Sequence, residues 1–167
     1  MIRGLDIREA GERDAEAIRG LLDAAFETDG ESRLVAQLRR DGDCVLELIA
    51  AQEGELVGEI FFSRLRVASP EGSFDALALG PLAVLPRMQR TGIGHALIDQ
   101  AHPVLTARGE RLCVVLGDPA YYGRFGYTHD RAAGFESNYQ SEYLQALAWG
   151  EAPVSGALRY PAAFEGL

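Results

Sequence analysis

The stretch Leu82–Ile98, with the sequence LAVLPRMQRTGIGHALI, decides how the chain is organised. An apolar strand ends at a proline, a short polar turn follows, and a helix begins near Gly92 and Gly94. The first N–H groups of a helix lack partners within the helix, and the helix dipole makes that end positive. Such a helix start binds phosphate, and glycine lets a ligand approach the backbone closely. With Arg87 and Arg90 just before the helix, the stretch predicts a phosphate-bearing ligand.

Two common phosphate motifs do not account for this turn. The Walker pattern ends in Gly-Lys-Ser/Thr, and the turn contains no lysine. The dinucleotide-binding pattern needs a third glycine three residues after the second, where this chain has Leu97. A nucleotide-binding protein is therefore disfavoured. Glycines before an ordinary helix are common, so composition alone favours a helix start without a ligand.

The predicted strand Phe74–Leu85 contains an interruption in its alternation. Apolar residues occupy odd positions up to Leu79 and even positions from Leu82 onward. A shift of one residue is what a β-bulge produces, and proline cannot donate a hydrogen bond within a central strand. The pattern predicts a bulge at Gly80-Pro81, with two short strands joined by a kink as the alternative.

Several segments resemble one known family. Gln89–Gly94 matches, position by position, the Gln/Arg-x-x-Gly-x-Gly acyl-CoA loop of the GCN5-related N-acetyltransferases (GNAT). Tyr121–Tyr127 closely resembles the Tyr-x-x-Phe/Leu-Gly-Phe/Tyr segment that follows the fifth strand in these enzymes. Leu79–Pro86, Gly117–Gly126 and Tyr160–Phe164 are similar to stretches of the YhbS-like branch, so the resemblance extends over most of the chain.

The resemblance implies an acetyl-CoA-dependent N-acetyltransferase in which a primary amine attacks the thioester directly within a ternary complex. In this family the bulged strand parts from its neighbour, and its free backbone groups pair with the pantetheine arm of the cosubstrate. Backbone N–H groups near Val84 would then stabilise the developing oxyanion. The residues that the resemblance assigns to acetyl-CoA are Leu82, Ala83, Val84, Gln89, Arg90, Thr91, Gly92, Ile93, Gly94 and His95.

Tyr122 is the catalytic residue that the resemblance implies, as the general acid for the departing thiolate. A thiol has a pKa of about 8.5 and tyrosine one of about 10, which is close enough for proton donation. A buried amphipathic tyrosine without a catalytic role is the alternative. Tyr121, rotated by about 100° on the same short helix, is expected to point elsewhere.

No general base is assigned. Many family members place a carboxylate or histidine on the bulged strand, and this sequence has none between Ala76 and Leu85. Glu47 and Glu59 on neighbouring strands are candidates, but each is expected to be a solvated strand residue. A non-catalytic acyl-CoA-binding sensor or scaffold is therefore the alternative function. The acidic turn Glu27–Glu31 and the terminal strands are expected to border the acceptor pocket, which suggests a cationic amine.

The periodicity of the whole chain predicts one α/β domain over residues 1–167, with a mixed, mostly antiparallel sheet and helices on both faces. Strands are predicted at 4–8, 44–52, 56–68, 74–85, 111–117, 142–149 and 155–160, with a short helix as the alternative for 142–149. Helices are predicted at 14–26, at 32–40 with Ser32 as cap, from Gly92 toward Gly109, and at 120–125 with Asp118 as cap. Pro103 predicts a kink or an early end near His102.

Composition and charge exclude several other classes. The net charge of −9 argues against nucleic acid, which is bound through Lys and Arg, and it suits a small-molecule or protein amine. The chain has no apolar run of about 18 residues and does not begin with a signal peptide, so neither a membrane partner nor secretion is expected.

The cysteines and histidines carry no sign of a metal site. Cys44 and Cys113 lie in apolar runs and are predicted to be reduced core residues of a cytoplasmic protein. His95, His102 and His129 are scattered without metal-ligand spacing. Neither a metal nor any cofactor beyond acetyl-CoA is expected, and a homodimer is left open.

Overall fold

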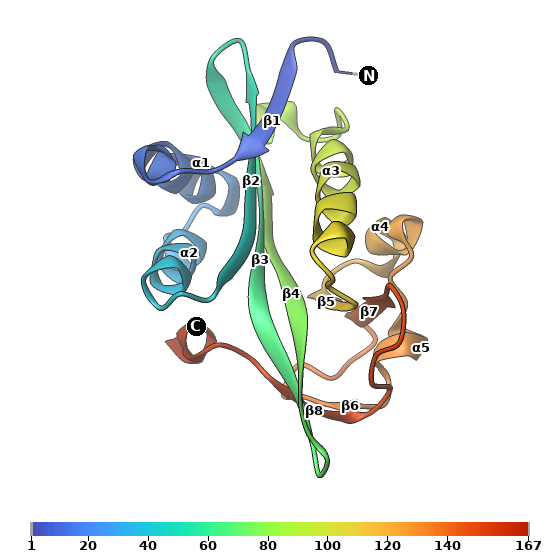
Figure 1. Cartoon of the computed structure of the whole chain (residues 1–167). Coiled ribbons are helices and arrows are strands. Elements are labelled where there is room, and N and C mark those ends of the chain that lie inside the picture. Colours follow the sequence, from blue (N-terminus) through green and yellow to red (C-terminus); the bar gives the residue numbers. More distant parts are fainter. Residues whose placement is uncertain (1, 167) are drawn as a thin grey trace.

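The computed structural model describes residues 2–166 and has the predicted α/β class (Figure 1). Its strands are β1 (Leu5–Glu9), β2 (Cys44–Gln52), β3 (Glu55–Ser69), β4 (Gly72–Val84), β5 (Leu112–Leu116), β6 (Phe135–Glu136), β7 (Leu144–Ala148) and β8 (Gly156–Arg159). Its α-helices are α1 (Ala15–Phe26), α2 (Gly30–Arg40), α3 (Ile93–Ala107), α4 (Pro119–Tyr122) and α5 (His129–Ala132). Short 3₁₀ turns lie at Glu12–Asp14, Pro86–Met88, Gly123–Phe125 and Ala162–Gly166.

Within residues 2–166 the strands form one eight-stranded sheet with the main order β1-β2-β3-β4-β5-β7. β8 pairs with the end of β3 and with the two-residue strand β6. Neighbouring strands are antiparallel except for β4 with β5 and β6 with β8. Because a parallel pair needs a crossover connection, α3 lies between β4 and β5 in the chain. The mixed, mostly antiparallel sheet is confirmed.

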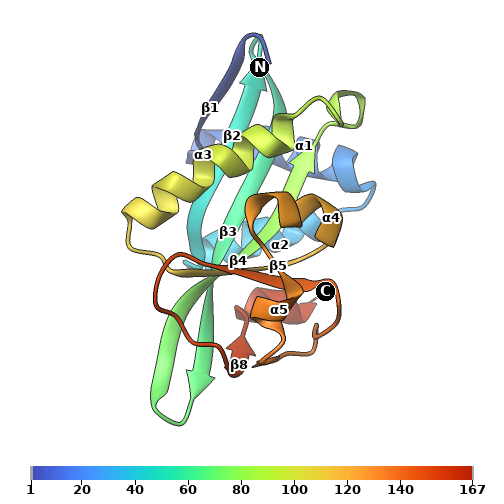
Figure 2. The same ribbon diagram turned by 90° about the vertical axis from the view of Figure 1, so that its right-hand side faces the viewer.

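Helices cover both faces of the sheet, as predicted (Figures 1 and 2). α1 and α2 lie on one face, over a core that includes Leu38 and Phe61. α3 crosses the other face, over a core that includes Leu97 and Phe62. The neighbouring residues Phe61 and Phe62 enter different cores because side chains alternate along a strand. Since each face of β3 is covered here, both phenylalanines are fully buried.

The predicted bulge lies in β4. Between Leu79 and Leu82 this strand takes three residue steps opposite the two steps between Ile60 and Phe62 on β3. The extra residue falls at Gly80–Pro81, as expected. In the described part of the chain, β4 pairs with β5 before the bulge and not after it. The two parallel strands therefore part at the bulge.

Of the two outcomes predicted for Pro103, the early end near His102 is wrong, because α3 continues to Ala107. Pro103 is exposed, whereas Ala101 and Leu105 beside it are buried against the sheet. The carbonyl that proline leaves without a partner, four residues earlier, belongs to an exposed residue, where water can satisfy it. Packing of the opposite face holds the helix together.

Two local predictions near α2 are wrong. Ser32 is not the cap, because α2 begins at Gly30 after Asp29, and the Ser32 hydroxyl instead donates to Asp23 Oδ1 at 2.6 Å. Cys44 is exposed at the first position of β2, where the chain enters the sheet from a loop, while Cys113 is fully buried. Both cysteines are free, and Cys113 is the one in the core.

The C-terminal part contains both predicted strands. β7 is a strand and not the alternative helix, and it pairs antiparallel with β5. β8 pairs antiparallel with the end of β3. α5 and β6 were not predicted, since each spans only two to four residues and leaves almost no periodicity.

Candidate active site

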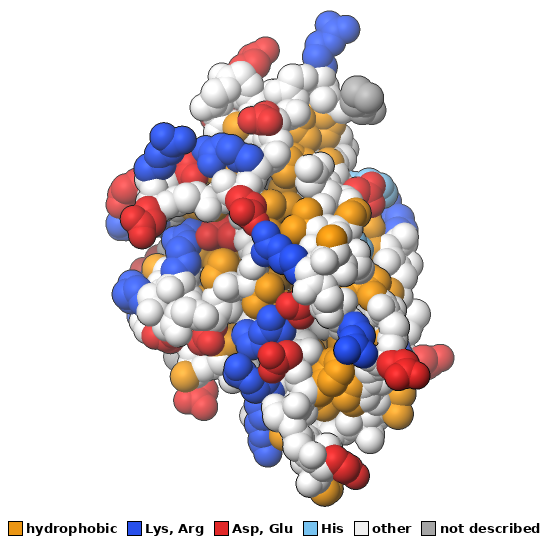
Figure 3. Space-filling model, in the orientation of Figure 1, with side chains coloured by type: hydrophobic (Ala, Val, Ile, Leu, Met, Phe, Trp, Pro, Cys, Tyr) orange, Lys and Arg blue, Asp and Glu red, His pale blue; other side chains and the backbone are white. Residues whose placement is uncertain are grey.

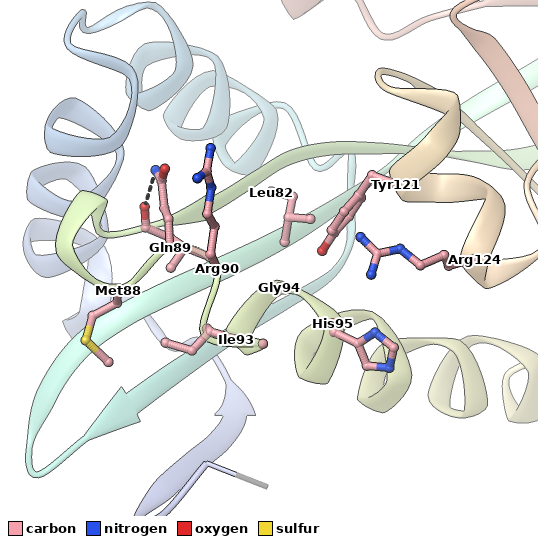
Figure 4. Close-up of a pocket in the computed structure, with 11 residues that line it drawn as sticks. Leu82, Met88, Gln89, Arg90, Ile93, Gly94, His95, Tyr121 and Arg124 are labelled. Atoms are coloured by element: carbon pink, nitrogen blue, oxygen red, sulfur yellow. Dashed lines mark hydrogen bonds between the residues drawn. The ribbon is translucent and has the colours of Figure 1, made fainter.

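A cavity of about 600 Å³ opens at Gln89–Gly94, the glycine turn (Figure 4). It lies between the end of β4, the start of α3, and α4 with the 3₁₀ turn that follows it. The residues that line this glycine-turn cavity are Leu82, Val84, Met88, Gln89, Arg90, Gly92, Ile93, Gly94, His95, Tyr121 and Arg124.

Eight of the ten residues predicted to bind the cosubstrate line the glycine-turn cavity, and Ala83 is one of the two that do not. The N–H of Leu85 donates to a β3 carbonyl at 2.9 Å. Alternate residues of an antiparallel strand direct their backbone groups to opposite sides. Ala83 therefore also directs its N–H and C=O toward β3, while Leu82 and Val84 direct theirs away from it.

Thr91, the other residue outside the cavity wall, holds the glycine turn together. Its hydroxyl donates to Met88 O at 2.6 Å, and Gln89 Nε2 donates to Val84 O at 3.2 Å, the contact drawn in Figure 4. Gly92 caps α3 with φ +96°, in the left-handed region that favours glycine. The first N–H groups of α3 have no partners within the helix and remain available to an anion at this end.

Tyr121 and Arg124 reach into the glycine-turn cavity from the side opposite the turn, and sequence reasoning assigned neither to it (Figure 4). The Tyr121 hydroxyl lies 2.6 Å from the position of a Cβ atom built on Gly94, so a side chain there would collide with it. The Arg124 guanidinium carbon lies 5.2 Å from the Tyr121 ring centroid. With Arg90, the cavity has two cationic side chains. Both missed residues lie in Tyr121–Tyr127, which carried part of the resemblance.

A second cavity, of about 310 Å³, lies where β4 and β5 part, and we name it the strand-fork cavity. Its wall consists of Phe26, Glu31, Leu34, Ala78, Leu79, Gly80, Pro81, Leu82, Val114, Val115, Leu116, Tyr122, Tyr139, Tyr160 and Phe164. Leu82 lines both cavities, so the two adjoin at the bulged strand. The resemblance implied that the bulged strand parts from its neighbour in this way.

The acidic turn contributes to the strand-fork cavity through one residue. Glu31 lies in its wall, whereas Glu27 and Asp29 do not. The end of the chain also reaches the cavity, through Tyr160 and Phe164 after β8.

Tyr122 lies in the wall of the strand-fork cavity, while Tyr121 lies in that of the glycine-turn cavity. The Tyr122 ring packs against Gly117, where a Cβ would lie 2.6 Å from Cε2. The Asp118 cap that starts α4 is confirmed, since its Oδ1 accepts from Ala120 N–H at 2.9 Å. Burial raises the pKa of Tyr122 above its usual value, so the hydroxyl stays protonated at neutral pH. The pKa of Tyr122 therefore lies further above that of a thiol than the ordinary pKa values of the two groups indicate.

Comparison with known proteins decides the family. Residues 6–129 match the acetyltransferase (GNAT) domain. This chain belongs to the GNAT family of acetyltransferases. It is 37% identical over 139 residues to the uncharacterized N-acetyltransferase YhbS of Escherichia coli (strain K12), which covers 78% of this chain and 82% of that protein. It is 38% identical over 119 residues to the uncharacterized N-acetyltransferase YjhQ of the same strain, covering 68% of this chain and 64% of that protein.

Solved structures show the same fold for this GNAT acetyltransferase. A GNAT family acetyltransferase from Brucella melitensis, in complex with acetyl-CoA, is 34% identical with a TM-score of 0.82, and the match covers 96% of this chain and 97% of that one. YhbS from Escherichia coli, in complex with CoA, is 28% identical with a TM-score of 0.89, covering 99% and 94%. The predicted acyl-CoA N-acyltransferase fold is confirmed, and membership makes the chain an N-acetyltransferase with acetyl-CoA as cosubstrate.

The two carboxylates considered as general bases of this GNAT acetyltransferase are buried, so the expectation of solvated residues is wrong. Glu47 is 8% exposed and Glu59 0%. Arg39 of α2 donates from Nε to Glu47 Oε1 at 2.8 Å, and its Nη2 lies 3.8 Å from Glu59 Oε2. A cation from α2, the helix that directly precedes β2, thus allows the carboxylates to leave water. They line neither cavity.

Glu59 is the more deeply buried carboxylate of the pair. Neither of its oxygens has a hydrogen-bond partner among residues 2–166. Burial, and next the proximity of Glu47, raises the pKa of Glu59 well above its usual value. One arginine thus faces two acidic side chains, and the raised pKa favours the protonated form of Glu59 beside Glu47.

The surface of this GNAT acetyltransferase carries mixed charge. Acidic and basic side chains are interspersed on the face shown in Figure 3, without one large basic area. Over residues 2–166, no helix is both long and apolar enough to cross a membrane. The same residues include no group of three or more His, Cys, Asp or Glu side chains placed to hold a metal ion.

Proposed function

We propose that this enzyme transfers the acetyl group of acetyl-CoA to a primary amine by direct attack within a ternary complex. The observation that carries the proposal is that the glycine-turn and strand-fork cavities share Leu82. A donor in the first cavity and an acceptor in the second would meet where β4 and β5 part. Both substrates can then be bound at once, as direct attack requires.

The glycine-turn cavity fits the diphosphate of coenzyme A. The first N–H groups of α3 are free of helical partners, and Gly92 and Gly94 leave them uncovered. Arg90 and Arg124 add positive charge beside them. The residues that we assign to this part of the cosubstrate are Gln89, Arg90, Thr91, Gly92, Ile93, Gly94 and His95, with Thr91 acting through the shape of the turn.

The bulged end of β4 fits the pantetheine arm. Leu82 and Val84 direct their backbone groups away from β3, and β5 no longer pairs with them. An extended amide chain can add to such a strand edge. Ala83, which directs its backbone groups toward β3, would hold the edge in place from behind. The acetyl-CoA and CoA named for the Brucella melitensis and Escherichia coli structures support this assignment.

The reaction needs an oxyanion donor and an acid. When bound, acetyl-CoA supplies a thioester carbonyl whose carbon bonds to the amine nitrogen while the C–S bond breaks. We assign the Val84 N–H, which is free of β3, to the developing oxyanion. Tyr122, protonated at neutral pH, would give its proton to the departing sulfur. Glu47 and Glu59 line neither cavity, so neither is assigned as the base. The proton that the amine nitrogen loses would pass to water, and Tyr122 would regain its own proton from water.

Thiol release with a panel of amines tests the proposed function. The enzyme is incubated with acetyl-CoA and each amine, free thiol is followed, and the product is identified by mass. The chain contains no lysine, so release without added amine cannot come from acetylation of its own lysine side chains. Amine-dependent release with equimolar acetylated amine is expected. Binding of acetyl-CoA without release for any amine would instead favour a non-catalytic acyl-CoA-binding module.

A further inference from the structure

The wall of the strand-fork cavity is mostly apolar and aromatic. Five of its fifteen residues are aromatic. Tyr139, Tyr160 and Phe164 form a continuous edge-to-face stack, with centroids 5.1 Å apart for the first pair and 5.4 Å for the second. Leu34 and Leu79 belong to the same wall. Aromatic and aliphatic surfaces of this kind bind an apolar body and exclude water.

Leu116 gives a second, independent sign of an apolar ligand. It is 51% exposed although the residues before it in β5, Leu112 to Val115, are buried. Large apolar side chains this exposed are few among residues 2–166, namely Leu116, Tyr143 and Val154, and Leu116 is the one in a cavity wall. A ligand that covered it would remove apolar surface from water.

Charge in the strand-fork cavity comes from one residue. Among the described residues that line it, Glu31 is the one acid, and no Arg or His side chain is present. A carboxylate in an apolar surrounding attracts an ammonium group and repels another carboxylate. A second ammonium group would lose its water without gaining a partner, which is costly.

We infer that the acceptor is a small primary monoamine with an aromatic or branched apolar body and no carboxylate, drawn into the strand-fork cavity by Glu31. The inference rests on the proposed function for the transfer step, but the preference of the cavity can be measured without it. Amino acids, polyamines and lysine side chains on a polar peptide are poor acceptors on this view.

Four probe amines test the class of acceptor through kcat/KM at saturating acetyl-CoA. These are 2-phenylethylamine, phenylalanine, spermidine and a lysine-containing polar peptide. 2-Phenylethylamine and phenylalanine differ by one carboxylate, so kcat/KM for 2-phenylethylamine should exceed that for phenylalanine by about 100-fold. The kcat/KM for 2-phenylethylamine should also exceed the values for spermidine and the peptide by about tenfold or more. If spermidine, phenylalanine or the peptide is acetylated best, the inference is wrong while the proposed function stands.

Wall variants test where the amine binds. Leu116→Gln should raise the KM for 2-phenylethylamine by about fivefold through lost apolar contact. Because Leu116 is half exposed, the variant should fold, and Tyr143→Gln, an equally exposed side chain outside both cavities, is its control. Glu31→Gln should raise the same KM by about fivefold with kcat little changed. Glu27→Gln is the control, because Glu27 lies four residues earlier, at the end of α1, and lines neither cavity.

Binding of 2-phenylethylamine to the enzyme–CoA complex, measured by calorimetry, separates the inferred acceptor class from the proposed acetyl transfer. If Leu116→Gln weakens this binding and Tyr143→Gln does not, the result supports the inferred acceptor class, even when no acetyl group is transferred. In that case the proposed function would fall instead. Absence of binding, or equal binding to Leu116→Gln and wild type, would overturn the inference.

Discussion

The hydroxyl oxygen of Tyr121 lies 2.6 Å from the position that a Cβ atom on Gly94 would occupy. Real Cβ atoms essentially never approach a heavy atom so closely, so α4 and the start of α3 touch in a way that glycine alone permits. The second glycine of the motif therefore has two roles. It leaves the helix start open to phosphate, and it lets Tyr121 close one side of the cavity.

Gly94→Ala should weaken acetyl-CoA binding, and Gly94→Val should abolish it while the protein stays folded. Combining Gly94→Ala with Tyr121→Phe separates the two roles, because without the hydroxyl the nearest ring atom is 3.7 Å from the new Cβ. Calorimetry with acetyl-CoA measures affinity, and thermal unfolding measures stability. We expect the double variant to regain stability but not affinity. If the double variant regained both stability and affinity, the Cβ atom at Gly94 would weaken binding only by displacing Tyr121.

Gly20→Ala is the control for these glycine variants. Gly20 lies in α1 with no atom within 4 Å of a Cβ and without a positive φ. The change should leave acetyl-CoA affinity unaltered and stabilise the protein by about 0.4–1 kcal/mol through the unfolded chain.

Tyr122→Phe should lower kcat by about 10²-fold, the low end of the range for general acid catalysis, because the raised pKa makes Tyr122 a weaker acid. The effect on acetyl-CoA affinity should be small. Tyr121→Phe cannot serve as the control, because Tyr121 lines the glycine-turn cavity. Tyr143→Phe is suitable, since Tyr143 is exposed and outside both cavities. Equal, small losses in kcat for Tyr122→Phe and Tyr143→Phe would mean that Tyr122 only packs.

Gly117→Ala tests the position of the same hydroxyl. A Cβ at Gly117 would lie 2.6 Å from Tyr122 Cε2 and would push the ring away from β5. Its backbone is not in the left-handed region, so the steric effect is separable from strain. Activity should fall in the single variant and fall no further when Gly117→Ala is combined with Tyr122→Phe. Additive losses in kcat would contradict the acid role.

Arg124→Gln should raise the Kd for acetyl-CoA by about 5–10-fold, since one cation of the glycine-turn cavity is lost. The difference from wild type should shrink as salt screens the charge. Arg66→Gln, on β3 and outside both cavities, should leave the Kd unchanged. A salt-independent loss would indicate that Arg124 acts by packing on Tyr121 instead.

Features set by neighbouring residues could be predicted from the sequence. The bulge at Gly80–Pro81, the Asp118 cap and the helix start at Gly92 each follow from a few adjacent side chains. The 100° step between Tyr121 and Tyr122 agrees with their lining different cavities, although their ring centroids lie only 5.0 Å apart. It could not show that Tyr121 faces Gly94, because that contact depends on how α4 packs on α3.

Features set by how one element packs on another could not be predicted. Strand and helix periodicity does not show that Arg39 of α2 folds back onto Glu47 and Glu59, so two buried acids were expected to be solvated. Ala83 was grouped with its neighbours because the sequence does not show which residues direct their backbone groups toward β3. Both features appear only when the register of β3 is known.

Glu59→Gln should stabilise the protein at neutral and alkaline pH. The folded-state pKa of Glu59 lies well above that of an unfolded glutamate, which is about 4.3. Below that value both states hold the proton and Glu59 makes no pH-dependent contribution. As the pH rises, the unfolded state loses the proton while the folded state keeps it, so the free energy of unfolding falls by up to about 1.4 kcal/mol per pH unit. The fall ends once the pH passes the folded-state pKa.

Glutamine has nearly the same shape and carries no proton to lose, so the variant should lack this fall. Urea unfolding of wild type and Glu59→Gln at several pH values between 4 and 9 measures the difference, which should be small near pH 4 and grow with pH. Glu47→Gln is the matched contrast, because it leaves the Arg39 guanidinium without its hydrogen-bonded partner and should destabilise at neutral pH. A pH-independent difference for Glu59→Gln would mean that Glu59 is ionised in the folded protein, with Arg39 shared between two carboxylates.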